Sequence, residues 1–140
     1  MADPAIVAHL LLTRCEALNV GTPKLPVAMP DVKFVPPVDA SKNPLPYLRV
    51  DLFDNQPVWQ GLASGRIDQG LLQIMIVWPK GKGVVAHRRA AKQVMDHFAK
   101  GTRLFGPATR ITVNREPVLA SPIMGDVSTE TPVTIFWTAV

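Results

Sequence analysis

The residues whose spacing is most suggestive of chemistry form the turn Gly81-Lys82-Gly83, between an apolar segment and a helical pattern. In such a turn, backbone N–H groups at the positive end of a helix can bind phosphate. A P-loop, however, has a longer glycine-framed loop that ends in Gly-Lys-Ser/Thr, and Val84 stands where its metal-binding hydroxyl would be. The sequence therefore favours a plain strand-to-helix connector, and a small phosphate-ligand enzyme is the weakest alternative.

No other residues have the spacing of a catalytic or metal site. Two residues separate Gly61 from Ser64, so this segment is not the Gly-x-Ser-x-Gly elbow of serine hydrolases. The only cysteine, Cys15, falls on the apolar side of a helical pattern, which favours a buried and inert thiol. His87 and His97 point about 80° apart on a second helical pattern and cannot share a metal. We predict a protein that is not an enzyme, with no catalytic residues, no cofactor and no metal.

Positive charge is concentrated in one part of the chain. Positions 80–103 hold seven basic residues against one acidic residue, whereas the other eight basic and ten acidic residues leave the remainder at −2. The cluster includes Lys80, Lys82, Arg88, Arg89 and Lys92. Such a stripe on a helix is a solvated face, a docking face for an acidic protein surface, or a contact for nucleic-acid phosphates. Aromatic residues are 6% of the chain and none lies between Lys80 and Lys92 to stack on bases, so a protein partner is favoured over nucleic acid.

Two helices are expected to position these residues. Asp3 and Pro4 are typical of an N-cap and a first helical residue, and apolar residues then recur at helical spacing, which predicts a helix from about Pro4 to Leu18. Gly21 is expected to follow its end. The second helix is predicted from Val84 to Lys100, with its charged stripe opposite an apolar face made of Val84, Ala91, Val94, Met95 and Phe98.

Four segments have strand patterns. Leu71 to Trp78 is apolar on both faces apart from Gln73, which predicts an interior strand covered on both sides. Tyr47 to Phe53 alternates and predicts a half-buried strand, and Thr109 to Val113 alternates likewise. Val133 to Val140 is a β-branched and aromatic run that predicts the last strand. The strand, helix and strand around the charged stripe make a βαβ-like step.

Two further segments lack a regular pattern. Residues 23–46 hold seven of the 14 prolines and predict an extended arm, in which Val27 to Phe34 can add a short edge strand. Asp54 to Gly70 is rich in turn residues and predicts a long hairpin or mobile loop. Its tryptophan, Trp59, either anchors an interface or folds back onto its own core, and Arg66 follows as a further candidate contact residue.

The length and composition predict one domain over residues 1–140. With 47% hydrophobic residues, the chain can bury a core without disulfides or metal. The apolar runs are too short to cross a bilayer, and the N-terminus lacks the early basic residues of a secretory signal, which favours a cytosolic origin.

Several segments, taken in order, resemble the small phage and prophage proteins related to lambda-type tail terminators. Each segment is unspecific alone, and their order and spacing over nearly the whole chain carry the resemblance. They are an N-terminal helix, Pro26 to Val32 with Phe34 and Pro36-Pro37, Tyr47 to Val50, Gly70 to Ile74 with Pro79, Gly81 and Gly83 before a helix, and a closing strand from Pro132 to Ile135.

The resemblance implies an α/β (α+β) fold with a mixed, mostly antiparallel sheet of about four to five strands, flanked by two helices. It also implies a structural virion protein that assembles as a homohexameric ring. Such a ring caps the tail tube, ends its polymerisation and joins it to the head-tail connector, so the implied partners are other copies, the major tail tube protein and neck proteins. Genomic DNA would pass through the lumen without sequence-specific binding, with no membrane involved. The protein would lie at the head-proximal end of the virion tail after assembly in the host cytoplasm. A nucleic-acid-binding module that uses the basic helix 84–100 is the alternative.

Overall fold

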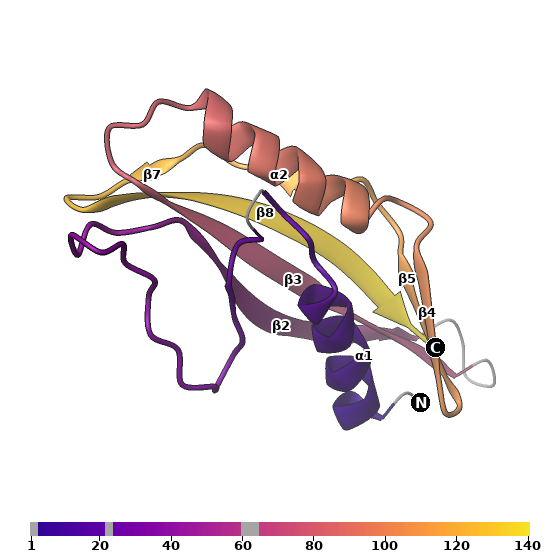
Figure 1. Ribbon diagram of the computed structural model, residues 1–140. Coiled ribbons are helices and arrows are strands. Elements are labelled where there is room, and N and C mark those ends of the chain that lie inside the picture. The colour runs from indigo at the N-terminus through magenta and orange to yellow at the C-terminus, as the bar shows by residue number, and fades with distance from the viewer. Residues whose placement is uncertain (1–2, 22–23, 60–64) are drawn as a thin grey trace.

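The computed structural model describes residues 3–21, 24–59 and 65–140. These residues form one sheet of eight strands in the order β1-β2-β3-β8-β5-β4, with β6 and β7 also paired to β8, and both helices lie on the same face of it (Figure 1). No helix in these ranges has both the length and the apolarity of a membrane span. The elements are α1 (Pro4–Glu16), β1 (Val27–Ala28), β2 (Tyr47–Trp59), β3 (Arg66–Pro79), α2 (Val85–His97), β4 (Arg103–Gly106), β5 (Thr109–Val113), β6 (Val118–Leu119), β7 (Ile123–Met124) and β8 (Ser128–Ala139).

The expected α+β class is confirmed, and the mixed sheet is mostly antiparallel. Of the eight strands, β1, β6 and β7 have two residues each, which leaves five longer ones. β1 is the parallel exception and pairs with Leu48 and Arg49 at the edge of the sheet, as expected for a short strand in the proline-rich arm. β3 and β5 are both antiparallel to β8, so they run parallel to each other with β8 between them. The predicted βαβ-like step therefore exists, although its two strands are not neighbours.

The core lies between the helices and the centre of the sheet. Leu72 pairs with Ile135 and Ile74 with Val133 in the β3–β8 register, and all four side chains are fully buried. Thr131 shares this face and contacts His87 of α2, which identifies it as the helix-facing side. Because apolar burial stabilises a fold by about 25 cal/mol per Å², this layer is the main stabilising contact of the molecule.

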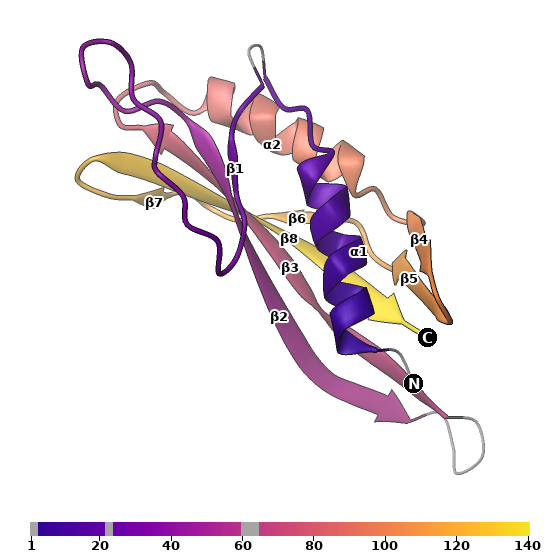
Figure 2. The ribbon, with the colours of Figure 1, turned by 60° about the horizontal axis from the view of Figure 1, so that its bottom comes forward.

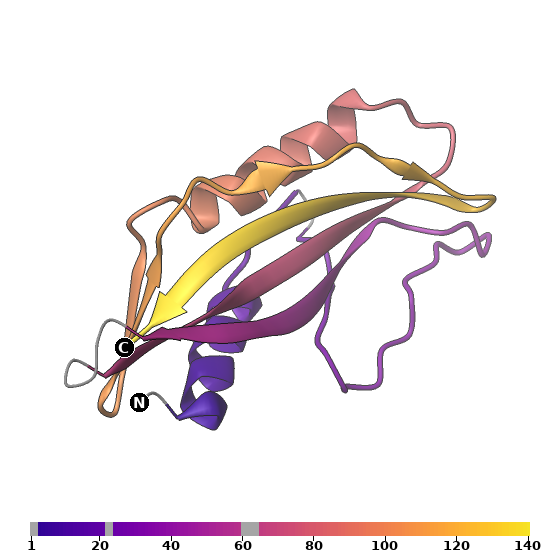
Figure 3. The ribbon, with the colours of Figure 1, turned by 180° about the vertical axis from the view of Figure 1, so that it is seen from behind.

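The opposite face of the sheet corrects one prediction. The apolar run from Leu71 to Trp78 predicts a strand covered on both sides, but both helices lie on one side, as the view from behind also shows (Figure 3). Met75 and Val77 are still buried on the second face, whereas Leu71 and Gln73 are only half-buried. Strands of an antiparallel sheet commonly have one packed and one solvated face, and the apolar run does not distinguish this case from a fully covered strand.

The two helices begin and end for local reasons. The Asp3 carboxylate accepts a hydrogen bond from the Ala5 backbone N–H at 2.8 Å, as expected of an N-cap. α1 ends at Glu16, before the predicted Leu18, and its C-cap is Ala17 in a right-handed conformation, so Gly21 with its φ of +80° is not the cap. In α2, Phe98 is fully buried, as the apolar pattern predicts. Val84, by contrast, is 45% exposed and is the N-cap that precedes the helix. The prediction that Val84 belongs to the buried apolar face of this helix is therefore wrong.

A reciprocal pair of hydrogen bonds joins the helices. Arg14 Nη2 donates to the backbone carbonyl of His97 at 2.7 Å, and His97 Nε2 donates to the backbone carbonyl of Arg14 at 2.8 Å. Burial lowers the pKa of His97, and the hydrogen bond to Arg14 opposes that change. The contact fixes the crossing of α1 and α2, which both cover the sheet.

The segment from Asp54 to Gly70 is a hairpin of two long strands. β2 continues to Trp59 and β3 begins at Arg66, with a register shift between Asn55 and Val58. Proline and glycine in this segment are typical of a loop, but the ladder with β3 continues past Pro57 because this strand lies at the sheet edge, where a missing N–H costs little. The hairpin and the proline-rich arm lie at opposite ends of the sheet (Figures 1 and 2).

Candidate functional site

The residues predicted to mediate contacts fall into two separate groups. Trp59 and Arg66 pair across the hairpin at one end of the molecule, while the basic residues follow β3 and line α2 from its other end (Figure 1). The structure therefore does not join these candidates into one site.

At the hairpin, Trp59 and Arg66 behave differently. Trp59 is 66% exposed, so of the two alternatives it does not fold back onto the core of its own chain. The Arg66 guanidinium instead lies 3.1 Å from the Asp68 carboxylate, and both side chains are largely covered. Arg66 is thereby engaged within its own hairpin, which leaves Trp59 as the exposed side chain of the two candidates.

The basic cluster is exposed along its whole length. Lys80 and Lys82 precede α2, and Arg88 and Arg89 lie on its outer surface; none of the four forms an ion pair with another described residue. Lys92 Nζ lies 2.6 Å from the Asp96 carboxylate one turn later. Exposed pairs of this kind contribute about 0.3–0.5 kcal/mol, so Lys92 is partly neutralised at little gain in stability. Within the described part of the chain, the other four cations are therefore available to attract an acidic surface.

Two adjoining cavities next to Lys80 were not predicted from the sequence. They have volumes of about 730 and 150 Å³ and lie between the arm, the end of β3 and the start of β8. We call them together the proline groove, whose walls include Pro36, Pro37, Val38, Pro44, Leu45, Trp78, Pro79 and Val127. The high proline content of the arm indicated an extended segment that could form one wall of the groove. The other wall is formed by segments distant in sequence, which no local pattern indicates.

The arm that forms the groove is held in place by its own contacts. The Asp39 carboxylate accepts hydrogen bonds from the backbone N–H groups of Ser41 and Asn43 at 2.8 and 2.9 Å, which lowers its pKa. The Phe34 ring contacts the Tyr47 ring on β2, with centroids 5.1 Å apart. The arm is therefore an ordered loop in its described part, and the groove is preformed.

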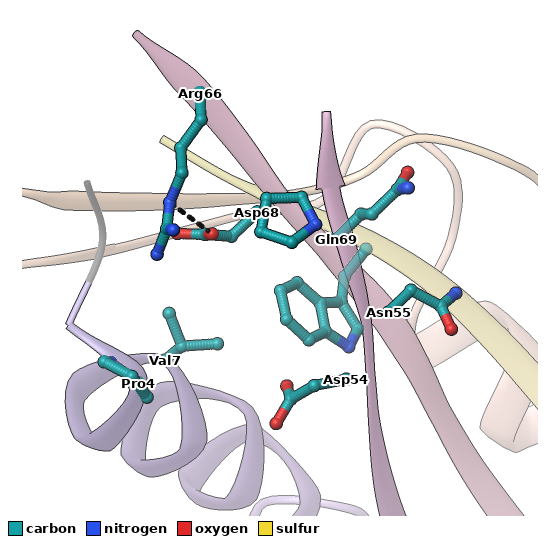
Figure 4. A pocket seen from close by; sticks show the side chains of 9 residues that line it. Pro4, Val7, Asp54, Asn55, Arg66, Asp68 and Gln69 are labelled. Atoms are coloured by element: carbon teal, nitrogen blue, oxygen red, sulfur yellow. Dashed lines mark ion pairs between the residues drawn. The ribbon is translucent and has the colours of Figure 1, made fainter. Parts of the chain in front are cut away.

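A third cavity, of about 190 Å³, lies at the base of the hairpin beside α1 (Figure 4). Trp137 lines it, and its indole N–H is buried with no hydrogen-bond partner among the described residues. Asp54 and Asn55 face the same space, while Arg66 and Asp68 are paired across its rim. The polar groups there are of both signs, and among the described residues that line it no nucleophile is paired with a general base.

The remaining chemically active side chains are engaged in packing. Cys15 is fully buried, and burial raises the pKa of its thiol to about 12, so the predicted inert cysteine is confirmed. The described residues contain no group of three or more histidine, cysteine or acidic side chains that could hold a metal. Gly81 and Gly83 adopt positive φ values in an exposed turn that joins β3 to α2. Ser64 lies outside the described residues.

Acidification is expected to destabilise the fold through His87. Burial lowers the pKa of this imidazole, the Arg88 charge lowers it further, and Nδ1 lies 3.1 Å from Thr131 Oγ1. A histidine in an unfolded chain has a pKa of about 6.5. The unfolded state therefore binds more protons below that pH, and the free energy of unfolding falls as pH drops from about 6.5 through the lower folded pKa. Urea unfolding at neutral and mildly acidic pH measures this loss.

The variant His87→Gln removes the titrating ring and is expected to flatten that pH dependence. His97, whose pKa is also lowered by burial, retains its own contribution, so His97→Gln is the comparison variant. A pH dependence in His87→Gln that equals that of the wild type would contradict the assignment to His87.

Comparison with known proteins identifies the family. A family model described as phage tail terminator protein matches residues 6–137. No curated protein matches the chain. A solved structure with 20% sequence identity superimposes with a TM-score of 0.78 over 100% of this chain and 97% of that one, which shows a shared fold. On the match over most of its length, the chain belongs to the phage tail terminator family, a family of structural tail proteins and not of enzymes.

Proposed function

We propose that this chain is the terminator subunit of a phage tail, which forms a ring on the last layer of the tail tube and ends its polymerisation. The family match over residues 6–137 is the observation that carries the proposal. The hairpin and the arm that forms one wall of the proline groove lie at opposite ends of the sheet, which supports the proposal because a ring subunit needs two unlike contact surfaces. The ring is expected to be a homohexamer that joins the tube to the connector and neck proteins, with DNA passing through its lumen.

Tail length is the measurement that tests this function. Cells that assemble tails without this protein are expected to produce tubes of irregular, excessive length, and the wild-type chain should restore a uniform length. Imaging of the restored particles should show a six-fold ring at the head-proximal end of the tube. Tails of normal length without the protein, or particles that lack it, would exclude the terminator function.

We further propose that the basic cluster docks a neighbouring tail protein. The exposed positions of Arg88 and Arg89, with no ion pair among the described residues, are compatible with this function. The triple variant Arg88→Ala/Arg89→Ala/Lys92→Ala is expected to fold with a melting temperature close to that of the wild type, since exposed charges contribute little to stability. It should nevertheless join fewer tails to heads, counted by electron microscopy.

Nucleic-acid binding is the second candidate for the same cluster, because its cations are exposed. It predicts duplex affinity that falls steeply with salt and is lost in the triple variant. A matched control removes three other exposed cations, Lys33, Arg103 and Arg110. One result would make nucleic acid the partner and the docking proposal wrong. In that result, the α2 triple variant joins tails to heads as the wild type does but loses duplex binding, while the control variant retains both properties.

A further inference from the structure

We propose that the Trp59 end of the hairpin in one copy docks into the proline groove of the next copy. This inference rests on the proposed ring and names the two surfaces that meet in it. A closed ring of identical subunits uses a heterologous contact, in which one surface binds a different surface of its neighbour. The hairpin and the arm that forms one wall of the groove lie at opposite ends of the sheet and offer two such unlike surfaces (Figure 2).

The hairpin presents large apolar side chains to solvent. Phe53, Val58 and Trp59 on β2 are 47%, 48% and 66% exposed. Val58 and Trp59 lie beyond the register shift at Asn55 but still pair with Ile67 and Arg66, so a two-stranded ribbon holds them. Tryptophan is enriched among the residues that anchor protein interfaces, and the pairing with β3 orders it before the partner binds, which lowers the entropic cost.

The groove offers an apolar receptor of suitable shape. Its prolines and Trp78 give flat, rigid walls, and Val38, Leu45 and Val127 remain exposed along it. The hydrogen bond from Leu45 N–H to the Pro37 carbonyl at 3.0 Å and the Asp39 turn keep the arm open without a partner. A flat indole ring can therefore bind against the walls of the groove without a prior rearrangement of the arm.

The charges of the groove and the hairpin favour a head-to-tail contact between two copies. Lys80 and Lys82 outnumber Asp39, the carboxylate that also lines the groove. Asp54 at the base of the hairpin forms no ion pair among the described residues. Arg66 is neutralised by Asp68, so the described part of the hairpin keeps a negative excess. Opposite charges attract the hairpin of one copy to the groove of another. Like charges disfavour a contact between two hairpins or between two grooves. The occupant of the groove is therefore a second copy in the same orientation, not a two-fold related one.

Cysteine crosslinking tests this contact. Trp59→Cys and Leu45→Cys change exposed side chains, and the buried native Cys15 does not react, so each variant has one reactive thiol. Copies of the two variants are mixed with a short bismaleimide, both as purified protein and during tail assembly in cells. We expect mixed dimers that join one Trp59→Cys chain to one Leu45→Cys chain, and few dimers of either variant with itself. The doubly substituted chain should give closed oligomers.

The wild-type contact is measured by self-association. Trp59→Ala is expected to weaken association by about thirtyfold or more, as for an interface anchor. Phe105→Ala is the matched control, because Phe105 is an equally exposed aromatic residue on β4, away from the groove. Association should be unchanged in that variant.

Each outcome separates the inference from the proposed function. Rings on tails without the mixed crosslink, or dimers that link identical variants, overturn the hairpin-to-groove contact and leave the terminator function intact. If neither purified protein nor assembled tails contain rings and tail length is uncontrolled by the chain, the proposed function and the inference fail together.

Discussion

Substitution of alanine for Gly70 is expected to destabilise the fold by at least about 3 kcal/mol, at the upper end for an overpacked core site. A Cβ atom at this position would lie 2.3 Å from the Phe53 carbonyl oxygen and 2.4 Å from Trp137 Cζ2. The indole can shift toward the cavity beside it, but the carbonyl belongs to the backbone of β2 and can move only if the strands separate. The substitution is therefore expected to weaken the hydrogen bonds between β2 and β3, which support the hairpin.

Chemical denaturation monitored by circular dichroism measures this effect. Gly83→Ala is the matched control, because a Cβ there meets open space although its φ is +76°. That strained conformation alone costs about 1–2 kcal/mol. If Gly70→Ala loses no more stability than Gly83→Ala, the close approach of Phe53 and Trp137 is not a real constraint.

The elements that sequence patterns predicted best have strong periodicity. The alternation from Thr109 to Val113 gave β5 with its correct bounds, and the cap at Asp3 gave the start of α1. Both signals are local, since alternation and capping depend on residues close in sequence. Tertiary position is not local, and this explains why the pattern past Asp54 could not distinguish a long hairpin from a loop.

The candidate site was predictable only in part. Charge clustering identified the exposed stripe at Arg88 and Arg89, and composition drew attention to Trp59. The engagement of Arg66 with Asp68 was not visible, because alternation places the two residues on one face of a strand without fixing a bond. The proline groove was also missed, since a cavity formed by the arm, β3 and β8 requires the fold to be known.

Phe98→Ala is expected to cost about 3–5 kcal/mol, a large share of the roughly 5–15 kcal/mol that holds a domain of this kind together. Phe98 is fully buried at the end of α2, where its backbone N–H donates to the Val94 carbonyl at 3.2 Å. Loss of the ring leaves a cavity between α2 and the sheet, and the neighbouring β-strands are too rigid to close it. Denaturant unfolding, with tail length as the functional measurement, checks both stability and assembly.

Val84→Ala distinguishes the structure from the sequence pattern. The apolar periodicity placed Val84 and Phe98 on one buried face, whereas the structure leaves Val84 45% exposed as the N-cap of α2. We therefore expect Val84→Ala to change the free energy of unfolding by no more than about 0.5 kcal/mol, as at other surface positions. If Val84→Ala and Phe98→Ala lost the same free energy of unfolding, Val84 would belong to the helix and pack against the sheet, which would contradict its place as an exposed N-cap.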